Sequence, residues 1–381
     1  MAQTKSAPAA KTANNLKALS ALGQSVWLDY IRRDLLTTGA LARLIEEDGL
    51  SGLTSNPSIF EKAIADSPDY APKLRELKAK PGLSAMDIYE AVAIDDIRAA
   101  ADALRPVYDK TKRRDGYVSM EVSPYLARDT RSTLAEARRL WKAVGRENLM
   151  IKAPGTPEGI PAIETLISEG INVNVTLLFS RELYAKAAWA YAAGLEQRAA
   201  KGQDISGIAG VASFFVSRID TAADARLAEA AKAGGERAKT AEGLLGKVAI
   251  ANAKLAYALY KDIIADQRWR ALEAKGAMTQ RLLWASTSTK NPKYRDVLYL
   301  EELIGRDTVN TVPPATLDAF RDHGRAAATL EQGLSEAKAQ LAALESLGIS
   351  LNAITDEVLF HGVKLFADAF DKLLAAVGRP S

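Results

Sequence analysis

Short apolar segments alternate along this chain with longer segments of helical periodicity. Eight of the short segments have the length, the apolar or alternating pattern and the flanking turn residues of β-strands. The predicted strands are Val26–Ile31, Gly52–Pro57, Tyr117–Pro124, Leu149–Thr156, Asn172–Ser180, Gly210–Arg218, Arg281–Ser288 and Thr308–Pro314.

Amphipathic segments lie between most of these strands and predict helices. The first is expected over about residues 15–22, and Ser84 with Asp87 three residues later has the pattern of an N-cap that opens a long helix. The chain between the second strand and Ser84 is expected to be a polar connection. The Ala-rich, charge-alternating segment 220–275 predicts two or three helices broken at Gly234-Gly235, and the tail is predicted to be helical.

Eight strands separated mostly by helices imply an α/β protein with a parallel sheet, and eight is the number that closes a (β/α)₈ TIM barrel. We therefore predict a single barrel domain over residues 13–381, preceded by a flexible tail (1–12), with additional N- and C-terminal helices. A helical insertion is expected around 220–275 and the C-terminal helices from about residue 315. The alternative is an open, doubly wound sheet, but no Gly-x-Gly-x-x-Gly loop follows the first strand and no Walker loop is present.

Composition narrows the chemistry available to such a barrel. The net charge is +3 and the basic residues are spread along the chain, which argues against a nucleic-acid surface. There are no cysteines and two histidines, His323 and His361, neither with a second ligand at metal-binding spacing. We therefore expect no metal and no cofactor, and acid–base work must come from carboxylates or lysine.

The N-terminal dozen residues are rich in Ala, Ser, Pro and Lys and lack the apolar core of a signal peptide. No later segment is apolar for long enough to cross a bilayer. We therefore expect a cytoplasmic protein with no membrane partner.

Three central strands alternate so that polar side chains share one face. In a parallel barrel the outward face packs under helices, so the apolar sets belong outside and the polar sets point inward. The outward sets are Val118, Met120 and Val122; Leu149, Ile151 and Ala153; and Val173, Val175 and Leu177. The inward sets are Ser119, Glu121 and Ser123; Met150, Lys152 and Pro154; and Asn172, Asn174 and Thr176. These inward positions predict a lined pocket at the C-terminal ends of the strands.

Lys152 is the chemically distinctive member of these sets. In a place where water is scarce the charged form of a lysine is disfavoured, so a neutral, nucleophilic amine becomes available. This is the requirement for Schiff-base chemistry on a carbonyl substrate. The alternative is an edge-strand lysine whose amine reaches solvent.

Three segments resemble those of transaldolases: Thr54–Ser58, Met150–Thr156 and Asn172–Ser180. The similarity extends in order over all eight predicted strands, from about residue 15 to 320, while the stretch around 222–247 and the tail fit the family core less well. The resemblance implies a class I aldolase-type barrel of the pentose phosphate pathway. Such an enzyme moves a dihydroxyacetone unit from sedoheptulose 7-phosphate to glyceraldehyde 3-phosphate, giving erythrose 4-phosphate and fructose 6-phosphate.

The resemblance also implies roles for four catalytic residues. Lys152 matches the Schiff-base lysine, and Asp29 matches the general acid/base that takes the C4 hydroxyl proton as the C3–C4 bond breaks. Glu121 matches a carboxylate that acts through a water molecule, and Thr176 matches the residue that holds this water. Two alternatives remain open: Asp29 as a helix N-cap, and Glu121 with Lys152 as a salt bridge without chemistry.

A second group of residues matches positions that bind substrate. Asn56, Asn174 and Ser213 match positions that bind the hydroxyls of the three-carbon unit, for which amide and hydroxyl groups are suited. Arg218 matches the phosphate-binding arginine and Ser286 a second phosphate contact.

The sequence departs from the family pattern at one phosphate-binding position. The pattern has an arginine two residues after the serine that matches Ser286, whereas this chain has Ser288 and offers Lys290 instead. We therefore predict Lys290 as the second phosphate-binding cation.

Two other functions compete with transfer between sugar phosphates. The first is a free fructose 6-phosphate aldolase, in which a tyrosine occupies the position of Phe215; a phenylalanine cannot donate a proton to help release the product. The second is a non-catalytic barrel that binds a sugar phosphate. The sequence leaves the assembly open between a monomer and a homodimer.

Overall fold

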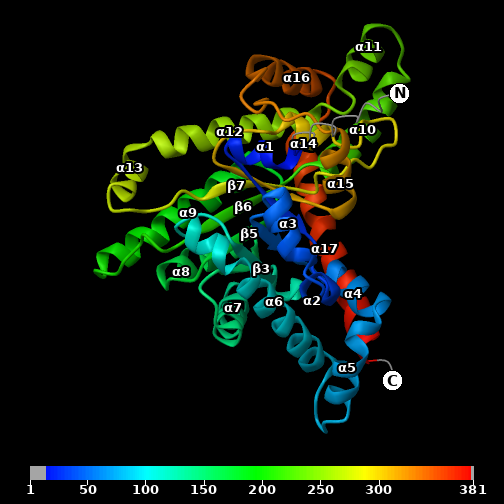
Figure 1. The fold of residues 1–381 in the computed structure, drawn as a ribbon. Helices are drawn as coiled ribbons and strands as arrows, with labels where there is room; N and C mark the ends of the chain where they lie inside the picture. Colours follow the sequence, from blue (N-terminus) through cyan, green and yellow to red (C-terminus); the bar gives the residue numbers. More distant parts are fainter. Residues whose placement is uncertain (1–13, 379–381) are drawn as a thin grey trace, which may run out of the picture.

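The computed structural model describes residues 14–378, so the tail predicted for residues 1–12 lies outside the described residues. Within this range, eight parallel strands pair in chain order and β8 pairs with β1, which closes a barrel (Figure 1). The strands are β1 (Gln24–Asp29), β2 (Gly52–Thr54), β3 (Tyr117–Glu121), β4 (Leu149–Pro154), β5 (Val173–Leu178), β6 (Gly210–Phe215), β7 (Arg281–Ala285) and β8 (Thr308–Val312). The predicted (β/α)₈ barrel and its eight strands are confirmed.

Helices surround the barrel and follow most of its strands. The α-helices are α1 (Asn15–Ala21), α2 (Arg33–Thr37), α3 (Ala40–Asp48), α4 (Pro57–Asp66), α5 (Ala71–Lys78), α6 (Ala85–Lys110), α7 (Thr130–Val144), α8 (Gly159–Ser168), α9 (Arg181–Ala200), α10 (Ser217–Ala231), α11 (Gly235–Leu244), α12 (Val248–Ala265), α13 (Gln267–Glu273), α14 (Leu298–Glu302), α15 (Pro314–His323), α16 (Leu334–Ser346) and α17 (Leu351–Gly378). Two short 3₁₀ helices are η1 (Pro68–Tyr70) and η2 (Pro124–Leu126). The predicted cap of α6 is present, because Ser84 and Asp87 exchange hydrogen bonds as a capping box.

The connection expected to be polar after the second strand contains α4 and α5. Oδ1 of Asn56 accepts a 3.0 Å hydrogen bond from the N–H of Ile59, and Pro57 occupies the first turn, where its missing N–H has no cost. The proline that ends the strand pattern is therefore also the start of a helix.

The segment 220–275 is occupied by four helices, α10 to α13, so the prediction of two or three was wrong. The predicted break at Gly234-Gly235 is present, and both glycines have positive φ. A further break falls at Gly246, whose φ is 70°, and another at Asp266, which caps α13. The first helix of the group begins before the predicted segment, at Ser217.

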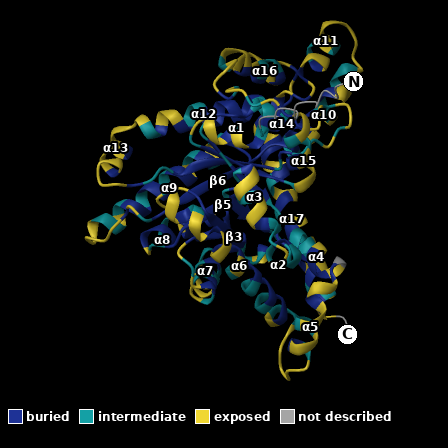
Figure 2. Ribbon diagram, in the orientation of Figure 1, coloured by how far each residue is buried: buried dark blue, intermediate teal, exposed yellow. Residues whose placement is uncertain are grey.

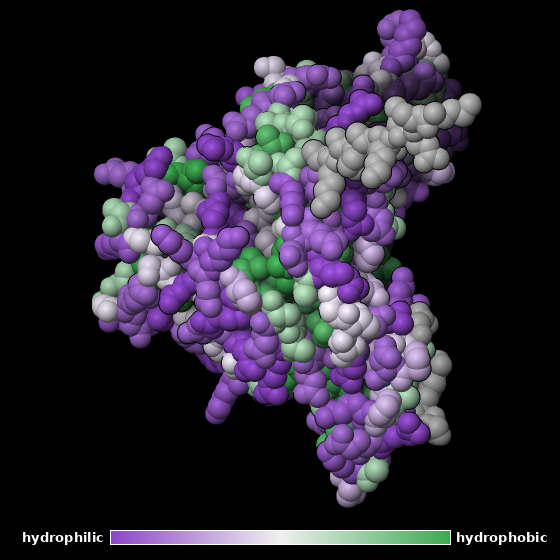
Figure 3. Space-filling view, in the orientation of Figure 1, coloured by the Kyte–Doolittle hydropathy of each residue, from purple (hydrophilic) through white to green (hydrophobic). Residues whose placement is uncertain are grey.

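The strands form the buried centre of the molecule. Every residue of β4, β5, β6, β7 and β8 is buried, and Figure 2 shows the exposed residues on the outer surfaces of the helices. Alternation along β5 is interrupted near its end, because Leu177 has a φ of 61° and the register with β6 shifts between Val175 and Leu178. The face of the molecule seen in Figure 3 is mostly hydrophilic, with apolar side chains gathered in small areas.

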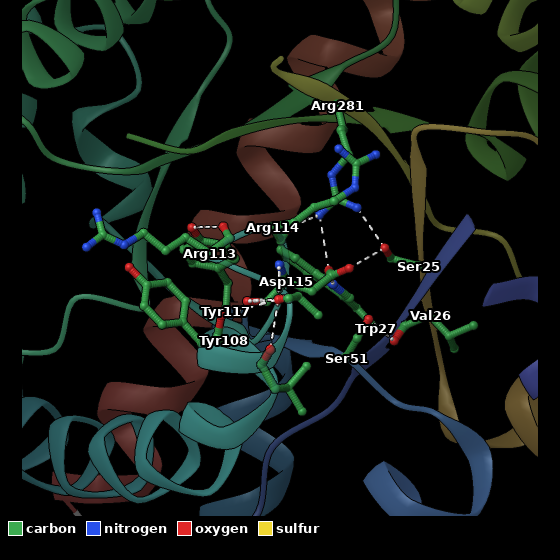
Figure 4. Close-up of polar contacts among 12 residues, drawn as sticks. Ser25, Val26, Trp27, Ser51, Tyr108, Arg113, Arg114, Asp115, Tyr117 and Arg281 are labelled. Atoms are coloured by element: carbon green, nitrogen blue, oxygen red, sulfur yellow. Dashed lines mark hydrogen bonds and ion pairs between the residues drawn. The ribbon is translucent and has the colours of Figure 1, made fainter. Parts of the chain in front are cut away.

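A polar network closes the barrel at the N-terminal ends of the strands (Figure 4). Arg281 forms a buried ion pair with Asp115, with 3.1 Å between Nη2 and Oδ1, and also donates a 2.7 Å hydrogen bond to Ser25. Trp27 and Ser25 donate hydrogen bonds to the two oxygens of Asp115. Because the carboxylate and the guanidinium have several partners each, this buried charge pair stabilises the bottom of the barrel instead of leaving polar groups unpaired.

The 28-residue α17 returns from the end of the chain to the barrel, running along α4 and α6 and contacting α10 and β5 (Figure 1). Gly362 allows this approach: a Cβ there would lie 3.1 Å from Cδ2 of Leu177 and 3.2 Å from Nη1 of Arg218. A larger side chain would push the helix away from the barrel. None of the helices in residues 14–378 combines the length and apolar character needed to cross a membrane.

Candidate active site

A cavity of about 130 Å³ lies at the C-terminal ends of the strands, where the polar inward positions were predicted to converge. Eight of the eleven predicted site residues line it: Asp29, Asn56, Lys152, Ser213, Phe215, Arg218, Ser286 and Lys290. It is also lined by Thr54, Ala285, Ser288, Thr311, Pro313 and Phe366. Side chains from strands on opposite sides of the barrel, and one from α17, therefore meet in one place.

Lys152 is buried at the centre of this arrangement, with only 4 % of its surface exposed. Its Nζ lies 3.2 Å from Oε2 of Glu121 on β3 and donates a 3.2 Å hydrogen bond to the carbonyl of Ser55. The strand β4 lies inside a closed barrel, flanked by β3 and β5. The alternative of an edge-strand lysine that reaches solvent is therefore wrong.

Asp29 ends β1 and accepts a 2.7 Å hydrogen bond from Thr54. The Thr54 hydroxyl also lies 2.6 Å from that of Thr311, and since its single proton goes to Asp29, Thr311 donates to Thr54. Burial raises the pKa of the Asp29 carboxyl, and the charge of Lys152 is the main opposing influence. The alternative of a helix N-cap is wrong, because α2 begins after Arg32 and has no side-chain cap.

Glu121 on β3 lies opposite Lys152 in the sheet register, whereas Thr176 on β5 lies opposite Pro154, and neither residue lines the cavity. Burial raises the pKa of the Glu121 carboxyl, and Lys152 opposes this rise. The Thr176 hydroxyl is fully buried and has no hydrogen-bond partner within the part of the chain that the structure describes. The salt bridge between Glu121 and Lys152 is present, so the carboxylate is placed to accept a proton from the amine.

The three residues predicted to bind hydroxyl groups occupy different places. Asn56 lines the cavity, and because its Oδ1 caps α4, its Nδ2 is the group left for a ligand. Ser213 lines the cavity and donates a 2.7 Å hydrogen bond to Oδ1 of Asn174. Asn174 is fully buried and donates in turn to Ser119, so both ends of its amide are engaged within the protein. Direct contact of Asn174 with a substrate stays a prediction.

Two cations and a serine form the basic side of the cavity. Arg218 lies in the first turn of α10, and its Nη1 is buried without a hydrogen-bond partner among residues 14–378. Burial lowers the pKa of Arg218, opposed by Glu121 and Asp29. Lys290 donates a 2.7 Å hydrogen bond to Ser288, and Ser286 shares a 2.8 Å hydrogen bond with Ser217. Two cations on one cavity, one with an unpartnered buried donor, are suited to bind a phosphate.

Two aromatic rings close the cavity, and only one of them was predicted. Phe215 packs against Phe179 with 5.2 Å between ring centroids, and the Arg218 guanidinium lies 5.2 Å from the centre of the Phe215 ring. Phe366 from α17 lies 5.7 Å from Nζ of Lys152 and 5.6 Å from Cζ of Arg218. The sequence shows Phe366 only as one apolar position of an amphipathic helix, which is typical of core packing.

A larger cavity, of about 860 Å³, lies at the opposite end of the barrel. It is lined by Gln24, Ser25, Asp115, Arg306 and Asp307 among others, and by none of the predicted site residues. Active sites of such barrels lie at the C-terminal ends of the strands, so the smaller cavity is the candidate active site. Among residues 14–378, no three side chains of the kinds that ligate metals are grouped to hold an ion.

A parallel (β/α)₈ barrel that holds a buried lysine, two carboxylates and two cations at the C-terminal ends of its strands has the architecture of an aldolase-type enzyme. The family model described as transaldolase/fructose-6-phosphate aldolase matches residues 26–377, and the chain belongs to this family. The match reaches α17, so the tail fits the family better than the sequence led us to expect.

The names of similar proteins are consistent with this family. A transaldolase 2 of Nostoc sp. is 51% identical over 367 residues, covering 95% of this chain and 96% of the relative. A transaldolase of Thiobacillus denitrificans is 51% identical over 368 residues, covering 96% and 100%. One of Neisseria gonorrhoeae is 47% identical over 360 residues, covering 94% and 98%.

Proposed function

We propose that this protein is a transaldolase that carries a dihydroxyacetone unit on Lys152, from sedoheptulose 7-phosphate to glyceraldehyde 3-phosphate. The observation that carries this proposal is the position of Lys152, buried in one cavity with Asp29 and two cations and 3.2 Å from Glu121. The names of the relatives support transfer as the reaction. The step belongs to the pentose phosphate pathway.

Formation of the Schiff base uses Lys152, Glu121 and Thr176. Glu121 accepts a proton from the lysine through a water molecule held by Thr176, and the neutral Nζ attacks C2 of the ketose. The attached nitrogen then gives up a second proton, and the same relay delivers this proton and the one held by Glu121 to the C2 oxygen, which leaves as water and leaves the protonated imine. The buried and unpartnered Thr176 hydroxyl supports this role, because a water bound there would complete its hydrogen bonding.

Cleavage uses Asp29. Its carboxylate takes the proton of the C4 hydroxyl, the C3–C4 bond breaks, and the electron pair is delocalised into the protonated imine as an enamine. Erythrose 4-phosphate leaves. The enamine carbon then attacks the aldehyde of glyceraldehyde 3-phosphate, Asp29 returns its proton to the new hydroxyl, and hydrolysis releases fructose 6-phosphate.

The phosphate of each substrate is bound by Arg218, Lys290 and Ser286. The unpartnered Nη1 of Arg218 supports this assignment, since a buried guanidinium donor without an acceptor is costly unless a ligand supplies one. Lys290 takes the place of the arginine of the family pattern. Asn56, Asn174 and Ser213 bind the hydroxyls of the three-carbon unit.

Phe215 favours transfer over release of free dihydroxyacetone. Its ring lines the cavity and carries no proton that could be given to the enamine carbon. A free aldolase is therefore disfavoured.

The test is turnover of fructose 6-phosphate and erythrose 4-phosphate by the full-length chain, with both products measured. We expect sedoheptulose 7-phosphate and glyceraldehyde 3-phosphate in equal amounts, and no turnover by Lys152→Ala. Free dihydroxyacetone without an acceptor would indicate an aldolase. A folded wild type that binds the sugar phosphate without turnover would indicate a non-catalytic barrel.

A further inference from the structure

The helix α10 carries two aspartates one turn apart, and each binds a tyrosine from the segment between β7 and β8. The hydroxyl of Tyr299 donates a 2.8 Å hydrogen bond to Oδ2 of Asp220, and that of Tyr294 donates a 2.6 Å hydrogen bond to Oδ2 of Asp224. Asp220 and Tyr299 are each only 1% exposed. Two bonds to carboxylates therefore join α10 to this segment, and bonds to charged acceptors are the stronger kind.

The other oxygen of each aspartate is also occupied. Oδ1 of Asp220 accepts a 2.7 Å hydrogen bond from the N–H of Ala249, in the first turn of α12. Oδ1 of Asp224 accepts a 3.0 Å hydrogen bond from the N–H of Gly246, at the turn before that helix. Because both oxygens of each carboxylate have partners, neither aspartate can turn away from its tyrosine without losing a second contact.

The same segment is attached to α10 at its other end. Ser217 and Ser286 share a 2.8 Å hydrogen bond between their hydroxyls, and the N–H of Ser217 donates a 3.1 Å bond to the carbonyl of Ser286. Lys290 lies between the two attachments, in a stretch that forms neither helix nor strand. The position of its amine therefore depends on how the two ends of the stretch are anchored.

Electrostatic repulsion between Arg218 and Lys290 acts against this anchoring. Arg218, on α10, and Lys290 line the same cavity. Burial, and after it the charge of Arg218, lowers the pKa of Lys290. Two cations that repel one another tend to move apart, so the stretch that carries Lys290 requires attachments that keep its amine on the cavity.

We propose that Asp220 and Asp224, acting through Tyr299 and Tyr294, are positioning residues that hold Lys290 at the phosphate site beside Arg218. The inference rests on the proposed function, because it takes the phosphate of a sugar substrate as the ligand of the two cations. A loosened Lys290 weakens phosphate binding and leaves the chemistry at Lys152 unchanged.

The experiment compares Tyr294→Phe and Tyr299→Phe with the wild-type chain, using fructose 6-phosphate as donor and inorganic phosphate as competitive inhibitor. We expect the KM for fructose 6-phosphate and the Ki for inorganic phosphate to rise together by about three- to tenfold, the size of effect expected when about one hydrogen bond to the phosphate is lost. The kcat should stay within about twofold. The matched control is Tyr260→Phe, which removes another buried tyrosine hydroxyl, one that contacts Thr279 away from the cavity.

Lys290→Met separates failure of the inference from failure of the proposed function. If Lys290→Met leaves the KM and the Ki unchanged, the phosphate assignment itself is wrong. If Lys290→Met raises both values and the tyrosine variants do not, the positioning role is wrong. A third outcome would also overturn the proposal: the tyrosine variants lose both kcat and thermal stability while the Ki for inorganic phosphate is unchanged. The two hydrogen bonds would then contribute only to the packing of the helices.

Discussion

Thr54 donates a 2.7 Å hydrogen bond to Oδ1 of Asp29, and this bond joins the second strand of the barrel to the first. The Thr54 hydroxyl stabilises the ionised carboxylate and so lowers the pKa of Asp29 against the effect of burial, which raises it. The carboxylate must be ionised to take the C4 hydroxyl proton. The pair therefore sets the lowest pH at which cleavage is efficient.

We expect Thr54→Val to move the acidic limb of the kcat/KM profile upward by about one pH unit, the effect of losing one hydrogen bond to a charged group. Without the donor the pKa of Asp29 rises further, so a larger fraction is protonated at a given pH. The measurement is the pH profile of transfer between pH 5 and 9. Thr311→Val, which removes the donor to Thr54, should give a smaller shift in the same direction, and an unmoved acidic limb in Thr54→Val would contradict this role.

Phe215→Tyr should raise the cleavage of fructose 6-phosphate in the absence of an acceptor. The new hydroxyl would add a proton donor to the lining of the cavity, so the enamine could be protonated and released as dihydroxyacetone. Phe215→Leu, which adds no hydroxyl, is the control. If the rate without acceptor is the same in Phe215→Tyr and the wild type, the apolar ring does not explain the preference for transfer.

Phe366→Leu should lower kcat/KM by about 2- to 30-fold, the range for loss of a ring facing a cation. Its ring lies close to both Lys152 and Arg218. The matched control is Phe370→Leu, one turn further along α17, where the ring packs against Tyr89 and not on the cavity. We expect both variants to lose stability but only Phe366→Leu to lose activity; equal losses of activity would mean that α17 acts only by packing.

Asp220 should make the stability of the protein depend on pH. Burial raises the pKa of its carboxyl to about 7, with Asp224 as the like-charged neighbour, above the usual value of about 4 in an unfolded chain. An acid with a raised pKa in the folded state contributes most to stability below about pH 4, and this contribution is lost as the pH rises through about 7.

Asp220→Asn removes this titration. Relative to the wild type, the variant should therefore gain in free energy of unfolding between pH 5 and pH 8. Urea unfolding of both proteins at the two pH values measures the change. A difference between them that is the same at both pH values would show that Asp220 does not titrate in this range.

The inward faces of the central strands could be predicted from the sequence because the alternation of a strand is local. Ser119 and Asn174 are fully buried and joined by a hydrogen bond, and Glu121 contacts the buried Lys152, as the two-residue period indicated. The period is interrupted at the irregularity of β5 around Leu177, where the register with β6 shifts. Lys290 was predicted from a missing arginine, and it lines the cavity.

The remainder of the site depends on contacts between distant parts of the chain. Thr54 and Thr311 are 257 residues apart and meet because the barrel closes between β1 and β8. Phe366 reaches the cavity because Gly362 lets α17 lie against the barrel. An apolar residue at helical spacing is typical of any packed helix, so the local pattern does not single out Phe366. The contact between Thr54 and Thr311 has no local signal either, because it depends on closure of the barrel.

The most direct test of the account is borohydride reduction of the wild-type chain in the presence of fructose 6-phosphate, followed by peptide mass spectrometry. We predict a borohydride-reduced three-carbon adduct on Lys152 that is absent from Lys152→Ala. In Asp29→Asn the amount of this adduct should be much smaller, because general acid–base groups contribute about 10²- to 10⁴-fold to the rate of cleavage. A folded protein that carries no adduct, or carries it on another lysine, would contradict the assignment of Lys152 as the nucleophile.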